Sequence, residues 1–322
     1  MTYTLIGKHE KDSRANRDAY INAMIEMMDA GKPLAHVDCD LMGCINTGKM
    51  KKAHPERVFN AGIAEQNGVG VAAGIAATGV PCFVHSFGCF ASRRVFDQAF
   101  LSAGYSKWPV HIVGSDPGVT AAFNGATHMP FEDMGLYMNV PDIVIVDPAD
   151  YAQTAALTKK LADVPYLTYM RLVRKGIVKV YEDGSDFELG KGVTLKDGSD
   201  VTIIASGIMV DEALKAEEQL AAEGVSVRLI DMHTWKPLDE EIILKAAKET
   251  GAIVVAENHQ VGTGLGSAVA NTIVSSDTLV PIERVGILNR WGQVGPQDFL
   301  MDEYNLRAAD IIAAVKKAIS RK

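Results

Sequence analysis

A single acidic residue opens a segment that is otherwise small and apolar. In the run RVFNAGIAEQNGVGVAAG, Glu65 and Gln66 precede residues that are mostly Gly, Ala and Val. One interpretation is an acid in the first turn of a helix, where the helix dipole favours negative charge. The other is a partly desolvated carboxyl whose raised pKa lets it share a proton with a ligand nitrogen. The second interpretation makes Glu65 a candidate for acid–base chemistry.

Two aromatic residues follow the apolar run VPCFV. Phe87 and Phe90 stand three residues apart in HSFGCFASRRVFDQ, with Gly88 between them. Aromatic residues at this spacing are usually core. Gly88, however, leaves room for a flat ligand, and ring stacking adds about 0.5–1.5 kcal/mol beyond the burial of area. Phe87 and Phe90 therefore remain open as core residues or as a stacking platform.

A third polar loop follows the apolar run PVHIV. The segment GSDPGVTAAFNGATHMPFED is punctuated by Gly and Pro, and it presents Asn124, Thr127 and His128. A lone histidine is more often structural than functional. This one shares its loop with other polar groups, and the charge of histidine changes near neutral pH. Both interpretations of His128 stay open on local pattern alone.

Alternating apolar runs and helix-like segments must position these loops. Strands are expected within residues 34–37, 80–84, 109–113, 142–146, 165–170, 201–206, 225–230 and 252–257, and helices between them and at the end of the chain. This alternation predicts an α/β fold with two doubly wound domains, each a mostly parallel sheet flanked by helices. Ligands of such sheets collect beyond the carboxyl ends of the strands.

The length and a change of composition suggest where the domains divide. The chain has 322 residues, and glycines interleaved with charges gather between residues 176 and 200. Domains of about 150 residues are typical. We expect a first domain over 1–180, a linker over 181–199 and a second domain over 200–322.

Charge and cysteine content exclude several functions. The formal net charge is −8, the wrong sign for binding nucleic acid or an anionic membrane surface. The four cysteines have no CxxC spacing, which favours reduced core residues over zinc ligands and predicts a cytoplasmic protein with no metal ligands of its own. No secretory signal or membrane span is expected, so the mature protein should start near Met1.

Several motifs together resemble the transketolase family. They are RVFNAGIAEQN, the Phe-x-x-Phe segment leading into DQA, GATHMPFED, DIVIVDPAD, VTIIASG and AENHQVGTGLGS. The resemblance runs nearly end to end and covers the pyrimidine-binding and C-terminal domains of that family. The family's GDG motif for Mg²⁺ is absent from this sequence. The chain therefore resembles the C-terminal subunit of a split transketolase.

The resemblance implies roles for the polar and aromatic loop residues. Glu65 matches the acid that hydrogen-bonds the aminopyrimidine ring of thiamine diphosphate and so promotes its activation. Phe87 and Phe90 match the aromatic residues that stack on the pyrimidine, and Arg93 falls at a variable position of the same cofactor site. His128 matches a histidine that contacts substrate hydroxyls and assists proton transfer.

The substrate site carries both retained and altered residues. Arg17, Arg171 and Arg174 stand at or near the family's arginines that pair with the substrate phosphate, and arginine suits bidentate recognition of anions. Asn124 replaces an aspartate that touches sugar hydroxyls, and Asp116 stands where many members have a phosphate-binding histidine. These changes indicate a non-standard donor or acceptor, with a differently placed phosphate or a sulfonate.

The last departure near the anion site is Cys44, which stands close to a familiar phosphate-binding serine. The implied reaction is transfer of a two-carbon glycolaldehyde unit from a ketose to an aldose. It requires thiamine diphosphate, Mg²⁺ held by an N-terminal-type partner subunit, and by family analogy an α2β2 assembly. The alternatives are the β subunit of a 2-oxo acid dehydrogenase, which GATHMPFED disfavours, and a non-catalytic regulatory subunit.

Overall fold

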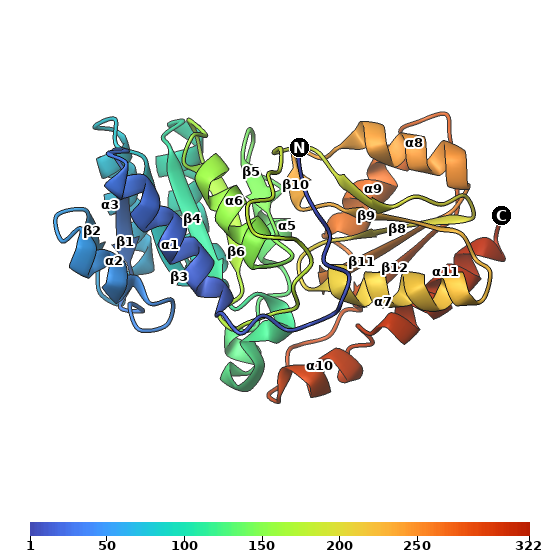
Figure 1. The fold of residues 1–322 in the computed structure, drawn as a ribbon. Helices are drawn as coiled ribbons and strands as arrows, with labels where there is room; N and C mark the ends of the chain where they lie inside the picture. The colour runs from blue at the N-terminus through green and yellow to red at the C-terminus, as the bar shows by residue number, and fades with distance from the viewer.

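Two sheets flanked by helices lie side by side in the computed structural model, which describes all residues 1–322 (Figure 1). Nearly all neighbouring strands in both sheets are parallel. The predicted fold class, two α/β domains with mostly parallel sheets, is confirmed.

The first sheet has seven strands in the order β10-β5-β6-β4-β3-β1-β2. Their bounds are β1 (Ala35–Asp38), β2 (Val58–Asn60), β3 (Cys82–Phe87), β4 (Val110–Ser115), β5 (Val144–Val146), β6 (Thr168–Leu172) and β10 (Thr234–Lys236). All residues of β1, β3, β4, β5 and β6 are buried, as expected for central parallel strands covered on both faces.

Helices cover both faces of this sheet. They are α1 (Asn16–Asp29), α2 (Thr47–Ala53), α3 (Glu65–Ala76), α4 (Phe96–Gln98), α5 (Asp133–Tyr137) and α6 (Tyr151–Leu161), with the π-helical turns η1 (Phe90–Arg94) and η2 (Ala99–Tyr105) and the 3₁₀ turns η3 (Gly118–Asn124) and η4 (Ala126–His128). α1 packs against α6, and α3 packs against η2. The Asp150 side chain caps α6 by accepting a hydrogen bond from the backbone N–H of Gln153, which satisfies a donor of the first turn.

The second sheet has five strands in the order β12-β11-β8-β9-β7. Its elements are β7 (Val193–Lys196), β8 (Val201–Ala205), β9 (Val227–Asp231), β11 (Ile253–Gln260), β12 (Ile282–Ile287), α7 (Met209–Ala222), α8 (Glu240–Thr250), α9 (Leu265–Val274), α10 (Gln297–Glu303) and α11 (Ala308–Ile319). α7 packs against α11, and α8 packs against α9. Each sheet therefore has its own pair of helical layers.

One strand from the second half of the sequence belongs to the first sheet. β10 pairs antiparallel with β5 at the edge of the seven-stranded sheet. Sequence analysis did not predict β10, β2 or β12, because short strands at sheet edges have weak apolar patterns. The segment expected as a linker contains β7, which pairs antiparallel with β9.

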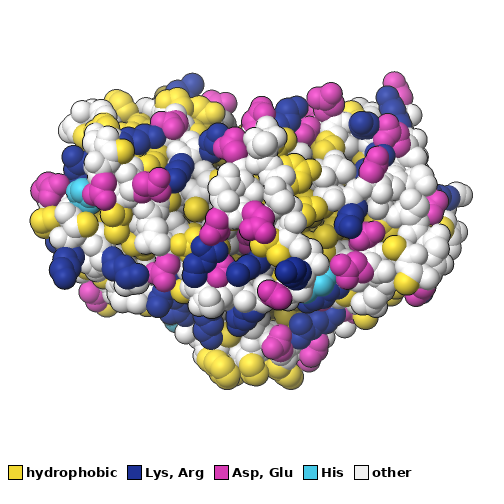
Figure 2. Space-filling view, viewed as in Figure 1, with side chains coloured by type: hydrophobic (Ala, Val, Ile, Leu, Met, Phe, Trp, Pro, Cys, Tyr) yellow, Lys and Arg dark blue, Asp and Glu magenta, His cyan; other side chains and the backbone are white.

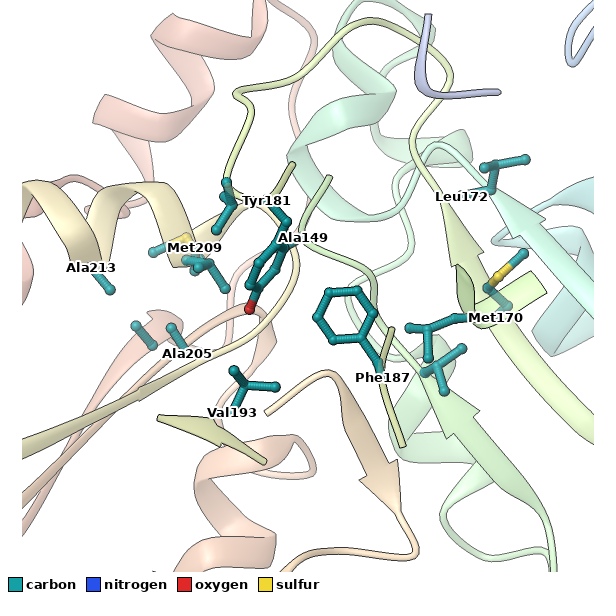
Figure 3. Close-up of a cluster of buried hydrophobic side chains, with 14 of the residues drawn as sticks. Ala149, Met170, Leu172, Tyr181, Phe187, Val193, Ala205, Met209 and Ala213 are labelled. Carbon is teal, nitrogen blue, oxygen red and sulfur yellow. The ribbon is translucent and has the colours of Figure 1, made fainter. Parts of the chain in front are cut away.

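A continuous apolar core joins the two halves of the molecule. One cluster of 54 buried residues includes Met170 of β6 together with Ala205 of β8 and Met209 of α7. Tyr181 and Phe187, from the connecting segment, lie between these two groups (Figure 3). The N-terminal residues run beside this segment through isolated bridges at Thr2–Asp186, Leu5–Tyr181 and Lys11–Val178. The start of the chain and the connection are thus packed structure.

Two further sequence features have a direct structural outcome. Every helix is too short or too polar to cross a membrane. The four cysteines carry free thiols, with Cys39, Cys82 and Cys89 buried and Cys44 partly exposed.

Candidate active site

The candidate residues gather beyond the carboxyl ends of β1, β3, β4 and β6. Glu65 begins α3, Phe87 ends β3, His128 ends η4, and Arg174 follows β6. These strands are neighbours in the first sheet, so their ends meet at the edge where open α/β sheets bind ligands. Figure 2 shows Lys and Arg side chains along the lower part of the molecule, above a lowest tip on which hydrophobic side chains gather. Figure 1 places the segment after β4 at this tip.

Glu65 is buried and paired with a cation. Only 5 % of its side chain is exposed, and its Oε1 lies 2.7 Å from Nη1 of Arg94. Ser86 Oγ donates a longer hydrogen bond of 3.4 Å to the same oxygen. Glu65 is also the first residue of α3, where the helix dipole stabilises a negative charge. Glu65 is therefore in the first turn of a helix and is also desolvated, and proton sharing with a ligand stays a prediction.

Three rings form a compact aromatic group beside Glu65. The centroids of Phe87 and Phe90 lie 6.3 Å apart, and the His128 ring lies 5.4 Å from Phe87 and 5.1 Å from Phe90. All three pairs meet edge to face, a favourable geometry for aromatic quadrupoles. His128 Nδ1 bonds Thr127 Oγ1 at 2.8 Å, and its Nε2 has no partner within the chain. The free ring nitrogen is available to a ligand.

Two consecutive arginines on η1 point in different directions. Arg93 pairs with Glu132 at 3.1 Å and contacts the Thr127 carbonyl. Arg94, which sequence analysis did not select, pairs with Glu65 and lies over the Phe90 ring at 4.0 Å from the centroid. The signal for Arg94 in the sequence is its position four residues after Phe90, which places both side chains on one helix face.

A second cationic group lies beside Phe87. Arg174 pairs with Asp116 at 2.6 Å and lies 5.5 Å from the Phe87 centroid. Asn124 Nδ2 donates to Asp116 Oδ2 at 3.4 Å. Burial raises the pKa of Asp116, while the charges of Arg174 and Arg17 act in the opposite direction. The structure thus brings Arg17, Arg174 and Asn124 together around one aspartate.

One N–H donor of Arg17 has no hydrogen-bond partner in this group. Its Nη1 donates to the carbonyl of Cys44 at 2.5 Å. Its Nε is buried and has no hydrogen-bond partner. A buried donor without a partner is costly, and an anionic ligand between Arg17 and Arg174 would satisfy it. The Cys44 backbone, not its thiol, is what reaches Arg17.

Arg171 lies elsewhere, although the resemblance implied that it pairs with substrate. Its side chain is 1 % exposed and its guanidinium binds Asp133 at 2.6 Å and Asp147 at 3.5 Å. It also donates to the carbonyl of Asn258, in β11 of the second domain. Side chains alternate along a strand, and Tyr169 shares both the face of β6 and the contact with Asp133. Arg171 therefore joins the two domains, and its buried guanidinium is bonded within the chain.

The ion pairs of Arg171 shift the two aspartates differently. Burial disfavours the charge of Asp133, but Arg171 outweighs it and holds the pKa of Asp133 below its ordinary value. Burial dominates at Asp147 and raises its pKa despite Arg171. Ser206 Oγ, from the second domain, donates to Asp147 Oδ2 at 3.1 Å. Every charge here has partners, as a stable buried group requires.

The second domain contributes one wall of a cleft beside the site. A cavity of about 540 Å³ is lined by Arg93 and Thr127 of the first domain and by Gln260, Arg290 and Trp291 of the second. The Trp291 side chain is 88 % exposed. Arg290 and Trp291 belong to the loop NRWGQVGPQD, which the structure places at the edge of the candidate site.

The site residues suit a flat, nitrogen-containing ring. Glu65 and Phe90 already hold the planar Arg94 guanidinium between a carboxylate and an aromatic face. An aminopyrimidine is likewise planar and can share a proton with a carboxyl group. No group of three or more His, Cys, Asp or Glu side chains is arranged to hold a metal ion. The donor set of Glu65, Phe87 and Phe90 is therefore compatible with the pyrimidine ring of thiamine diphosphate, which the resemblance implies.

Two protein-family models match the chain in sequence order. Residues 12–177 match the transketolase pyrimidine binding domain, and residues 190–311 match the transketolase C-terminal domain. The first match contains every predicted site residue. The second contains the loop that lines the cleft.

Similar proteins have names of the same kind. The chain is 42% identical to a 6-deoxy-6-sulfo-D-fructose transketolase subunit of Clostridium sp. (strain MSTE9), over 95% of each chain. It is 38% identical to an apulose-4-phosphate transketolase subunit of Phocaeicola vulgatus, over 85% of this chain and 87% of that protein. A solved structure titled as a split gene transketolase, inactive beta4 tetramer, superposes with a TM-score of 0.89 and 40% identity, covering 96% of this chain and 99% of that one.

Proposed function

Because the chain belongs to the transketolase family, we propose that it is the pyrimidine-side subunit of a split transketolase. It transfers a two-carbon glycolaldehyde unit from an anionic ketose to an aldose, in complex with an N-terminal-type subunit that binds the diphosphate and Mg²⁺. The observation that carries this proposal is Glu65, a buried carboxylate at a helix start whose partner Arg94 lies over the Phe90 ring.

Each residue of the site has a specific task in this proposal. Thiamine diphosphate, when bound, supplies the nucleophilic carbon and the electron sink that cleavage of a ketose requires. Glu65 holds a proton against a ring nitrogen, Phe87 and Phe90 orient the ring, and Arg93 lines the neighbouring cleft. His128 Nε2 bonds substrate hydroxyls and exchanges a proton with them.

The anionic end of the substrate binds at Arg17 and Arg174. The unpartnered Nε of Arg17 and the half-buried Arg174 support this assignment, and Asn124 contributes an amide beside them. The two relatives named for a sulfonated and a phosphorylated sugar also support it. Both names describe substrates with an anionic group, which arginine recognises through paired N–H donors.

The assembly and its place in the cell complete the proposal. A structural neighbour titled as an inactive tetramer of β chains supports a subunit that is inactive without its partner. We propose an active α2β2 complex with domains over residues 1–180 and 200–322, joined by 181–199. The free thiols favour a cytoplasmic protein.

Reconstitution tests the reaction directly. The chain is co-purified with its N-terminal-type partner, supplied with thiamine diphosphate and Mg²⁺, and given a sulfonated, a phosphorylated or an uncharged ketose with a common aldehyde. We expect a two-carbon mass gain of the aldehyde with the anionic donors. Release of CO₂ from a 2-oxo acid without ketol transfer would instead indicate the 2-oxo acid dehydrogenase type.

A carboxylate variant identifies the reacting group. We expect Glu65→Gln to lower the rate by about 10²–10⁴-fold, the usual contribution of a positioned acid or base. Asp97→Asn is the matched control, since Asp97 is an exposed carboxylate of α4 without an ion pair. Full activity of the Glu65→Gln complex would favour a regulatory subunit.

A further inference from the structure

The Arg94 side chain lies against the groups proposed to bind the pyrimidine ring. Arg94 Nη1 lies 2.7 Å from Glu65 Oε1, and its guanidinium carbon lies 4.0 Å from the Phe90 centroid. Glu65 and Phe90 are the carboxylate and one of the rings that the proposed function assigns to the cofactor. One arginine thus engages two of the three groups on which recognition of the ring depends.

A guanidinium and an aminopyrimidine place the same demands on this subsite. Both are planar and both stack on aromatic faces. The guanidinium donates N–H groups to Glu65, and the ring nitrogen of the pyrimidine shares a proton with the same carboxyl. Glu65 Oε1 already accepts from Arg94 and from Ser86, and one face of Phe90 is covered by Arg94. Arg94 and a bound ring therefore compete for the same oxygen and the same aromatic surface.

The position of Arg94 makes it easy to displace. Its side chain is 43 % exposed whereas that of Glu65 is 5 % exposed, so the arginine reaches solvent by rotation while the carboxylate stays in place. Arg94 is the last residue of the π-helical turn η1, and such turns are frequent at functional sites. A half-exposed ion pair contributes modestly to stability.

Arg94 also pairs with a carboxylate that is buried in the folded chain. A buried carboxylate has lost hydration, so a partner stabilises its charge, and the only cation paired with Glu65 is Arg94. Because Arg94 is half exposed, the gain from this pair is modest. We propose that Arg94 is a displaceable internal ligand, which shields Glu65 until the pyrimidine ring of the cofactor replaces it. This inference rests on the proposed function and adds a step to cofactor loading.

Binding measurements without substrate test this displacement. The dissociation constant of thiamine diphosphate is measured by calorimetry in the presence of Mg²⁺, on the chain co-purified with its partner. Removing the competitor should tighten binding, so we expect Arg94→Met to lower the dissociation constant by about 5- to 30-fold. Simple electrostatics predicts the opposite sign, because loss of a cation weakens attraction for a diphosphate.

Further variants separate competition from other effects. Arg94→Lys keeps the charge but loses the planar donor pair, so it should fall between wild type and Arg94→Met. In the Glu65→Gln background, Arg94→Met should lower the dissociation constant of thiamine diphosphate less than it does in wild type. The reason is that Glu65→Gln has already removed the Arg94–Glu65 ion pair. Arg57→Met is the control, because Arg57 pairs with Glu56 and the Lys32 carbonyl and contacts neither Glu65 nor Phe90.

Thermal unfolding of the chain alone gives a second readout. Arg94→Met should lower its melting temperature slightly while tightening cofactor binding in the complex, since both effects come from one contact. An unchanged or raised dissociation constant in Arg94→Met, with normal binding by wild type, would overturn the displacement alone. Failure of the wild-type complex to bind thiamine diphosphate would overturn the proposed function together with it.

Discussion

Arg171 and Arg174 are three residues apart in the sequence and lie in opposite surroundings. Arg171, within β6, is sealed between the domains with Asp133 and Asp147. Arg174, just beyond the strand, is 24 % exposed and pairs with Asp116 at the open edge of the sheet. The resemblance gave both the same role. The end of the strand separates a buried arginine between the domains from a partly exposed one, which we propose to bind substrate.

The wider surroundings of the two arginines repeat this contrast. In the contact region between the domains, Arg171 pairs with Asp133 and Asp147. Asp231 Oδ2 accepts from Tyr181 and Gln153 there, and its buried Oδ1 has no partner. At the site, Arg17 Nε and His128 Nε2 have no partner in the chain. Substitutions of the charged groups between the domains should therefore change the free energy of unfolding and its pH dependence. Substitutions at the site should mainly change ligand binding.

The largest effect is expected at Arg171. Arg171→Met leaves Asp133 and Asp147 buried without their cation, which should lower the free energy of unfolding by about 3–5 kcal/mol. Urea denaturation of the isolated chain measures it. Arg321→Met, which removes a half-exposed partner of Glu283, should change stability by less than about 1 kcal/mol. Equal losses in the two variants would contradict the contrast.

The next effect is a pH dependence that comes from Asp231. Burial raises the pKa of Asp231 to about 7, so between pH 4 and pH 7 the unfolded chain loses this proton while the folded chain keeps it. Its contribution to stability is therefore lost as pH rises through this window.

Asp231→Asn removes that titration. The variant should lose less stability than wild type between pH 4 and pH 7, by on the order of 2–4 kcal/mol. Denaturation midpoints across this range measure it, with Asp97→Asn as an exposed control. Part of the slope should remain, because burial also raises the pKa of Asp150 to about 6 and of Glu257 to about 8. If the stability of wild type and of Asp231→Asn changed equally with pH, the pKa of Asp231 would not differ between the folded and unfolded chains.

The site arginine should affect substrate more than stability. We expect Arg174→Met to raise the KM for an anionic ketose by about 10- to 100-fold, the loss of a charge-assisted hydrogen bond. The KM for an uncharged donor should change little, and unfolding should be less affected than in Arg171→Met. Steady-state kinetics of the reconstituted complex measure both constants. An equal rise for charged and uncharged donors would place the anionic group elsewhere.

The smallest effect is expected at Asn124. Asn124→Asp sets a second carboxylate beside Asp116, where Asn124 Nδ2 now donates at 3.4 Å. Two carboxylates compete for Arg174, so the KM for an anionic donor should rise about 3- to 10-fold near neutral pH and less in acid. A lower KM would show that a carboxylate at this position helps to bind the sugar.

The central strands were predictable because each is a short apolar run. β3, β4, β6, β8 and β11 are buried along most of their length, and burial on both faces demands such runs. β10 was not predictable from Thr234, Trp235 and Lys236 alone. Its place is determined by pairing with β5, some 90 residues earlier in the chain, and no local pattern encodes that partner.

The sequence predicted which residues belong to the candidate site. It did not predict which of them contact one another. Glu65, Phe87, Phe90 and His128 were selected from composition and motif, and the structure brings them together. Arg94 was missed because its role depends on the π-helical turn that aims it at Glu65. The direction of a side chain at the end of a strand or in a helical turn depends on the backbone there.

By itself the sequence determined the fold class, the family and the edge of the sheet where the chemistry lies, because these depend on residue types and their order. Only the tertiary structure decided that Arg171 lies buried between the domains, that Arg174 is partly exposed beside Asp116, and that Arg94 pairs with Glu65. These differences arise from burial and from contacts between distant segments, and both exist only once the chain has packed.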